Sequence, residues 1–136
     1  MYLLDTDILS NLLKRVPSVT LIVKLASVPA EQQFTSSITL AELLYGAYRL
    51  PMRTSSLLEK LEKTLLPNLP VLPFDVLAAW QYGKMRAELE RNGIVLGDAD
   101  MRIGSIALAR GLTVVTGNTQ HFRRIHRLSV ENWLEQ

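Results

Sequence analysis

Four acidic residues stand where a strand-like apolar run of the sequence gives way to a helix-like one. Carboxylates gathered from distant parts of a chain repel one another, by about 4 kcal/mol per pair at ~4 Å and an effective dielectric constant near 20. Such a cluster predicts a bound cation, and ligands that are all oxygen atoms predict a hard one, Mg²⁺ or Mn²⁺. The candidate ligands are Asp5, Glu42, Asp98 and Asp100.

Each of these acids also has a purely structural interpretation. Asp5 stands where an N-cap of the first helix is expected, and Glu42 comes three residues after Thr39, the spacing of a capping box. Asp98 is a typical N-cap residue, and Asp100 in a first helical turn would favour the helix dipole. The residue types alone therefore leave metal binding and helix capping open.

The elements that must position these acids are short strands alternating with amphipathic helices. This pattern predicts an α/β fold with a mostly parallel sheet of four to five strands and about six to seven helices. Ligands gather at the carboxyl ends of such strands. The expected strands are Tyr2–Leu4, Phe34–Ile38, Val71–Leu72, Leu112–Thr116 and a run near Leu128–Val130. The expected helices start near Asp5, Pro17, Thr39, Arg53, Asp75 and Met101, and end near Leu13, Pro29, Leu50, Leu65, Arg91 and Arg110.

Composition limits the class of protein. A chain of 136 residues fits a single domain, which we expect to span 1–136. No apolar stretch is long enough to cross a membrane, and the start of the chain lacks the features of a secretory signal. Cysteine is absent, which removes disulfides and thiolate metal sites. We therefore expect a cytoplasmic protein.

Positive charge is concentrated near the C-terminus. The net charge is only +2, but no acid occurs between Asp100 and Glu131, where five arginines and two histidines lie. Beside a metal site, such basic density indicates a phosphate backbone as ligand. The alternative is an ordinary solvated basic face. We expect Arg102, Arg123 and Arg124 to contact this backbone.

Four motifs in order resemble those of the PIN domain, and more narrowly the VapC type of toxin ribonuclease. The first contains Asp5, the second Glu42, and the third Asp100, the position on which the family's own Asp falls. The four motifs are Leu3–Asp7, Ser36–Gly46, Gly97–Leu112 and Thr116–Phe122. Their order and separations extend the resemblance over nearly the whole chain, which implies a single PIN-like domain.

Two positions depart from the family pattern. Position 118 is Asn where many PIN domains have Asp, so a fourth acidic ligand is missing unless Asp98 supplies it. We expect Asn118 to bond a metal-bound water or to steer Asp5, the alternative being a turn residue. Asp7 is an additional acid near the first motif, with an undecided role. Thr6 and Thr116 are expected to support the site.

The resemblance implies a metal-dependent endoribonuclease toxin. Asp5, Glu42 and Asp100 would hold one or two Mg²⁺ ions, partly through water, with Asp98 as an auxiliary ligand. Water as the nucleophile predicts products with 5′-phosphate and 3′-hydroxyl ends. Relatives of similar appearance attack transfer RNA at the anticodon loop. The resemblance also implies a cognate antitoxin that blocks the site, and a homodimer.

Three other functions compete with this interpretation. A haloacid dehalogenase-like phosphatase would use Asp5 and Asp7 as nucleophile and acid, but no lysine follows Lys84 to neutralise the phosphate. A phospho-receiver would use Asp75, and it too lacks its lysine after the last strand. A noncatalytic PIN-like RNA-binding module would not need the three acids.

Overall fold

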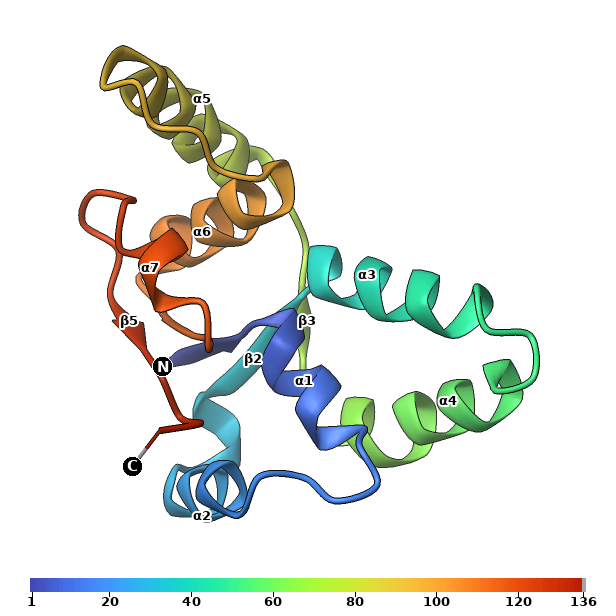
Figure 1. The fold of residues 1–136 in the computed structure, drawn as a ribbon. Helices are drawn as coiled ribbons and strands as arrows, with labels where there is room; N and C mark the ends of the chain where they lie inside the picture. Colours follow the sequence, from blue (N-terminus) through green and yellow to red (C-terminus); the bar gives the residue numbers. More distant parts are fainter. Residues whose placement is uncertain (136) are drawn as a thin grey trace.

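A five-stranded parallel sheet forms the centre of the computed structural model, which describes residues 1–135. The strands lie in the order β3-β2-β1-β4-β5, and each neighbouring pair is parallel (Figure 1). The first strand of the chain is therefore central. The strands are β1 (Tyr2–Leu4), β2 (Gln33–Ser36), β3 (Val71–Leu72), β4 (Thr113–Val115) and β5 (Val130–Glu131).

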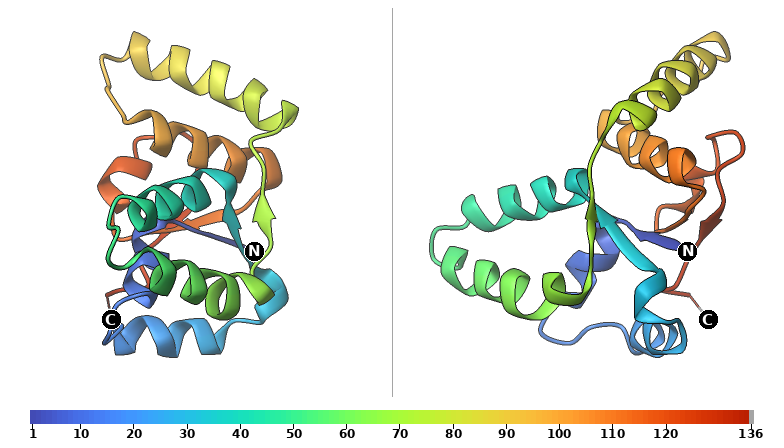
Figure 2. Two further views of the ribbon diagram at one scale, coloured as in Figure 1. Left: turned by 90° about the vertical axis from the view of Figure 1, so that its right-hand side faces the viewer. Right: turned by 180° about the vertical axis from the view of Figure 1, so that it is seen from behind.

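Helices cover both faces of this sheet. In Figures 1 and 2, α5, α6 and α7 lie on one side, α1, α2 and α4 on the other, and α3 beside the edge at which β2 ends. The predicted α/β fold is confirmed, with seven α-helices within residues 1–135. They are α1 (Thr6–Leu12), α2 (Val19–Ser27), α3 (Ser37–Tyr48), α4 (Thr54–Lys60), α5 (Val76–Arg91), α6 (Asp98–Arg110) and α7 (Thr119–Phe122).

Two hydrophobic cores hold the helices to the sheet. Side chains alternate along a strand, so Leu3 and Val114 enter the core beneath α5 and α6, whereas Leu4 and Val115 enter the core with α1 and α2. All four are at most 2% exposed. The central strands are thus fixed from both sides, which fixes the residues that follow them.

Several predicted boundaries are confirmed. β1 and β3 have the expected residues, and α5 ends at Arg91 as expected. Asp75 caps α5 by accepting a hydrogen bond from the Ala78 amide at 3.0 Å. Gly111 ends α6 in the left-handed conformation, with φ of 64°, which glycine adopts without strain.

The capping box that was the structural alternative for Thr39 and Glu42 is not formed. Ser36 is the N-cap of α3, because its hydroxyl accepts from the Thr39 amide at 3.0 Å. The helix therefore starts at Ser37, and the strand predicted to reach Ile38 ends at Ser36. Glu42 then lies beyond the first turn, and its carboxylate is available for another partner.

Three other helix starts or spans differ from the prediction. The helix expected at Pro17 begins at Val19, because the Ser18 hydroxyl caps the Leu21 amide at 3.3 Å. Asp98 is the first residue of α6 rather than its N-cap, since the carbonyl of Gly97 accepts the first helical bond. The helix expected over Arg53–Leu65 is α4 followed by a π-helical turn, Leu61–Leu65.

No helix within residues 1–135 combines the length and the apolar character that a bilayer crossing requires.

Candidate active site

Asp5 is a buried acid at the carboxyl end of the central strand. Its amide donates to the Val115 carbonyl at 2.9 Å, so it continues the pairing of β1 with β4. Its side chain accepts from the Thr116 hydroxyl at 2.8 Å, and the residue is only 4% exposed. Burial, and then the negative charge of Asp7, raise the pKa of Asp5 from 3.8 to about 7. Asp5 occupies the N-cap position of α1, but its side chain makes no cap bond.

Asp7 holds the turn that follows β4. The Gly117 amide donates to Asp7 Oδ2 at 2.7 Å, and the Thr116 hydroxyl lies 3.4 Å from Oδ1. A Cβ atom at position 117 would lie 2.7 Å from the same carboxylate oxygen and 3.0 Å from Leu134, so only glycine fits. The role of Asp7 was not predicted from the sequence, and neither was this role of Gly117. A glycine directly after a strand is a signal that another group approaches the backbone closely.

Glu42 is brought to the site by α3 and held there by Thr6. The Thr6 hydroxyl donates to Glu42 Oε1 at 2.7 Å and lies 3.1 Å from the Thr39 hydroxyl, which is fully buried. Since Thr6 directly follows Asp5, the bond connects α3 to the start of α1 at the carboxyl end of β1. The prediction of Thr6 as a supporting residue is in keeping with this contact, whereas Thr39 was not recognised.

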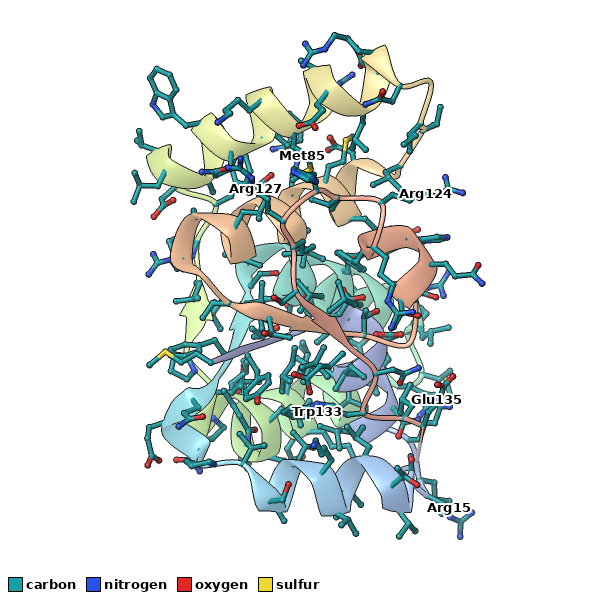
Figure 3. The ribbon with its side chains drawn as sticks, turned by 90° about the vertical axis from the view of Figure 1, so that its left-hand side faces the viewer. Arg15, Met85, Arg124, Arg127, Trp133 and Glu135 are labelled. Carbon is teal, nitrogen blue, oxygen red and sulfur yellow. The ribbon has the colours of Figure 1, made fainter. Side chains whose placement is uncertain are left out.

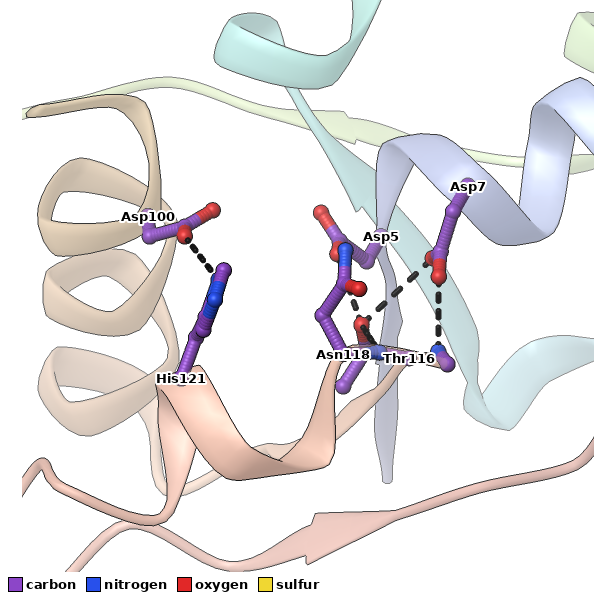
Figure 4. A network of polar contacts seen from close by, with 7 residues as sticks. Asp5, Asp7, Asp100, Thr116, Asn118 and His121 are labelled. Atoms are coloured by element: carbon purple, nitrogen blue, oxygen red, sulfur yellow. Dashed lines mark hydrogen bonds and ion pairs between the residues drawn. The ribbon is translucent and has the colours of Figure 1, made fainter. Parts of the chain in front are cut away.

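Asp100 faces Asp5 from the first turn of α6. Figure 4 shows it opposite Asp5 and Asn118, with His121 of α7 beside it. His121 Nδ1 lies 3.3 Å from Asp100 Oδ2. The charge of Asp100 is near enough to contribute to the raised pKa of Asp5. Asp5 and Asp100 thus face one another in the fold, and their shared role as metal ligands stays a prediction. The contact of Asp100 with His121 was not predicted.

Asn118 acts on Asp5 through its backbone. Its amide donates to Thr116 Oγ1 at 2.9 Å, and this hydroxyl in turn donates to Asp5. Figure 4 shows the Asn118 side chain reaching up beside Asp5. Asn118 is also the N-cap residue of α7 by position, with no cap bond from its side chain. The structure thus shows Asn118 in the turn after β4, and a role of its side chain in steering Asp5 or a metal-bound water stays a prediction.

Asp98 has partners outside the acid cluster. One oxygen accepts from the Tyr82 hydroxyl at 2.5 Å and the other from Arg102 Nε at 2.6 Å. These bonds lower the pKa of Asp98, the Tyr82 bond most. Metal binding by Asp98 stays a prediction that requires one contact to break. Arg102 also lies over the rings of Phe74 and Tyr82, so it connects α5 and α6.

The donors around Asp5 fit Mg²⁺ bound largely through water. Within residues 1–135, no three Asp, Glu or His side chains are grouped closely enough to enclose a metal ion by themselves. Mg²⁺ usually takes one or two carboxylates and keeps several waters. Asp5 is buried beside Asp7 and has no cationic partner in the described part of the chain. A divalent cation would supply the positive charge that this arrangement lacks.

Comparison with known proteins identifies the class. A family model of the PIN domain matches residues 2–128, so the chain belongs to the PIN-domain family. Ribonuclease VapC2 of Haemophilus influenzae is 34% identical over 135 residues, 98% of each chain. The tRNA(fMet)-specific endonuclease VapC of Shigella flexneri is 40% identical over 100 residues, 72% of this chain and 73% of that one.

A solved structure gives the same answer in three dimensions. The crystal structure of DNA-bound VapBC from Salmonella typhimurium has 36% identity, a TM-score of 0.88 and 97% coverage of both chains. The predicted resemblance to VapC-type toxin ribonucleases is therefore confirmed, and the matches support a nuclease.

Proposed function

We propose that the protein is a Mg²⁺-dependent endoribonuclease toxin that hydrolyses RNA at the carboxyl edge of its sheet. The observation that carries this proposal is Asp5, a buried acid that faces Asp100, lies beside Asp7 and has no cationic partner among the described residues. Glu42 is proposed as the third ligand because Thr6, the neighbour of Asp5, holds its carboxylate. Asp5, Glu42 and Asp100 would hold one or two ions, with Mn²⁺ as a substitute. The haloacid dehalogenase alternative leaves Glu42 without a role, and the family assignment favours the nuclease.

Chain residues prepare the site for this reaction. Thr116 orients the Asp5 carboxylate, Thr6 orients Glu42, and Asp7 fixes the turn at Gly117. The bound ion supplies activation of a water molecule and neutralisation of charge on the phosphate. Because water is the nucleophile, the 2′-hydroxyl is not consumed, and the products carry 5′-phosphate and 3′-hydroxyl ends.

The proposed substrate is transfer RNA, cut in the anticodon loop. The name of the Shigella flexneri relative, a tRNA(fMet)-specific endonuclease, supports this choice. Single-stranded loops are also where proteins recognise RNA bases most readily, because the bases there can unstack. Arg123 and Arg124, both exposed and following α7, are the proposed RNA contacts outside the acid cluster.

We propose that the cognate antitoxin binds an apolar groove of about 740 Å³ between α1, α3 and α4. Thr6 and Glu42 line one part of this groove, and Tyr45, Leu57 and Leu61 line others. A segment lying there would reach the active site and block it. Tyr45→Ala should weaken the toxin–antitoxin complex while cleavage by the free toxin persists, and unchanged affinity would contradict this placement.

A cytoplasmic homodimer is the proposed form of the free toxin. Three apolar side chains near the start of α5 are unusually exposed, Val76 by 72%, Leu77 by 63% and Trp80 by 74%. A second subunit would cover such a patch. Sedimentation that gives a monomer at micromolar concentration would remove the dimer from the proposal.

Mapping of RNA ends tests the activity. Purified transfer RNA is incubated with Mg²⁺ and wild type, Asp5→Ala, Glu42→Gln or the matched control Glu31→Gln, an exposed acid outside the site. Wild type and the control should cut at the same position, and the two site variants should not. A protein that binds RNA without cutting would be the noncatalytic module. Ends with 2′,3′-cyclic phosphate would exclude water as the nucleophile.

Comparing Glu42→Gln with Asp7→Asn separates the nuclease from the phosphatase. Loss of activity only in the first variant supports the nuclease, because only the nuclease uses Glu42. Loss only in the second supports a phosphatase that uses Asp7 as its acid. Chelation of divalent ions should abolish RNA cleavage. Addition of Mg²⁺ should then restore it.

A further inference from the structure

The segment Arg123–Arg127, here called the arginine loop, forms one wall of a polar groove. The groove has a volume of about 520 Å³ and lies between this loop and the second half of α5. Glu88 is the one acid in its lining. The basic side chains that line it are Lys84, Arg123, Arg124, His126 and Arg127. The groove is thus strongly cationic.

These cations differ from three arginines of the neighbouring helices α5 and α6. Arg86 pairs with Glu90 at 3.1 Å, Arg102 with Asp98 at 2.6 Å and Arg110 with Asp75 at 3.2 Å. In residues 1–135, no basic side chain of the arginine loop makes an ion pair or a hydrogen bond to a side chain. The fold therefore does not use the positive charge of the loop.

The loop is nevertheless firmly anchored. Ile125 at its centre is 2% exposed and packs so closely on α6 that a Cβ atom at Gly104 would lie 2.7 Å from it. The Ile125 amide donates to the Phe122 carbonyl at 3.0 Å. The basic neighbours of the buried Ile125 are exposed, so the backbone that carries the cations is fixed before any ligand binds.

Arg127 has an unusual backbone conformation. Its φ of 69° is the one positive value among the non-glycine residues that the structure describes. This region disfavours a residue with a Cβ atom, and glycine or asparagine is the usual occupant. An arginine at such a position indicates that the side chain itself has a use.

The arginine loop also continues directly from the active site. His121 lies beside Asp100, and the Arg124 amide donates to the His121 carbonyl at 3.3 Å. These two residues are three apart on a helical turn and therefore lie on one side of it. One helical turn of the chain thus links the acid cluster to a wall of the groove, so a polymer cut at the cluster can extend toward it.

We propose that this groove is a second RNA-binding site, which holds phosphates of the substrate strand away from the scissile bond. The inference rests on the proposed ribonuclease function and extends it. The binding residues are Lys84 of α5 and Arg124 and Arg127 of the loop. Cations that have no partner in the fold are suited to replace the counterions of a phosphate backbone.

Binding of labelled transfer RNA tests this site directly. All proteins carry Asp5→Asn and are kept in EDTA, so that no cleavage occurs. The test variant adds Arg124→Gln and Arg127→Asn, the second because asparagine tolerates a positive φ. The control adds Arg15→Gln, whose side chain lies at the opposite end of the molecule (Figure 3). Circular dichroism spectra of all variants should coincide.

Loss of two phosphate contacts should lower the affinity at low salt about tenfold or more. It should also reduce the magnitude of the slope of log K against log salt concentration by about 1.4, the value for two contacts with single-stranded RNA. The control should bind within about twofold of the parent with the same slope. In proteins with Asp5 intact, the same two loop substitutions should raise KM for RNA and leave kcat nearly unchanged.

A loop variant that keeps the parent's affinity and salt slope would overturn the inference. That failure is distinct from failure of the proposed function, which would appear as absence of RNA cleavage by the wild type. Preferential loss of duplex DNA binding, with RNA binding retained, would also overturn it.

Discussion

Substituting Asp5 by Asn should stabilise the metal-free protein at high pH. The carboxyl of Asp5 has a pKa of about 7 in the fold, against an ordinary 3.8, because it is buried and faces Asp7. A raised pKa means that the fold favours the protonated form. The stability gained from that form is complete below pH ~4 and is lost as the pH rises through about 7.

The size of the effect follows from the difference between the two pKa values. One pH unit corresponds to about 1.4 kcal/mol, so ionisation of Asp5 should cost up to about 4 kcal/mol by pH 8. Asparagine has the shape of the protonated acid and can still accept the bond from Thr116. It does not titrate, so the variant avoids this cost.

Urea unfolding at several pH values between 4 and 8, in EDTA, measures this difference. The free energy of unfolding of Asp5→Asn minus that of wild type should grow by up to about 4 kcal/mol from the lowest to the highest pH. Asp98→Asn is the control for this window. Tyr82 and Arg102 lower the pKa of Asp98 in the fold, so the stability that its carboxylate contributes is complete above pH ~4 and is lost only as the pH falls below it. The difference between Asp98→Asn and wild type should therefore stay constant from pH ~4 to pH ~8.

A difference between Asp5→Asn and wild type that stays constant from pH 4 to pH 8 would refute the reasoning. It would mean that the carboxyl of Asp5 is as well solvated or as well paired in the fold as in the unfolded chain. A difference of the predicted size that disappears in saturating Mg²⁺ would instead link the buried charge to the metal.

Four further outcomes follow from the same contacts. Saturating Mg²⁺, at 100-fold its Kd, should stabilise the wild type by about 2.7 kcal/mol in urea unfolding, and Asp5→Asn much less. Asp7→Asn should lower the pKa of Asp5, so the pH range over which stability is lost should end at a lower pH than in wild type. Thr6→Val should lower kcat about tenfold by releasing Glu42, and Thr6→Ser should restore it. Gly117→Ala should cost about 1–3 kcal/mol, seen as a lower Tm, because its Cβ meets the Asp7 carboxylate.

The sequence predicts the sheet and its central strand well, because a strand that is buried on both faces appears as a short, uninterrupted apolar run. Tyr2–Leu4 and Val71–Leu72 are apolar runs with clear stops, and both are found at the predicted residues. Helix starts are less predictable, since several polar residues compete for each cap. At α3 the competition was between Ser36 and Thr39, and Ser36 wins because its backbone is still extended, with φ of −115° and ψ of 157°.

The acids of the site could be named from the sequence, but not their partners. Asp5 follows β1, Glu42 lies on the helix that follows β2, and Asp100 lies in the first turn of α6, so the topology predicts that they gather at one sheet edge. The bond from Thr6 to Glu42 depends on how α1 and α3 pack, and the bonds of Asp98 depend on how α5 and α6 pack. Packing of this kind leaves no periodic signal in a sequence.

Partners therefore separate acids that look alike in the sequence. Asp98 and Asp100 stand two residues apart at one helix start, yet Asp98 has a phenol and a guanidinium to offset its charge, and Asp100 has only a histidine at 3.3 Å. The same distinction applies to the cations, since Arg102 is paired and the arginine loop is not. Charges already neutralised within the fold stabilise it, and those left over at one edge are available to metal and phosphate. The acids around Asp5 and the cations of the groove are two such groups, and their charges are of opposite sign.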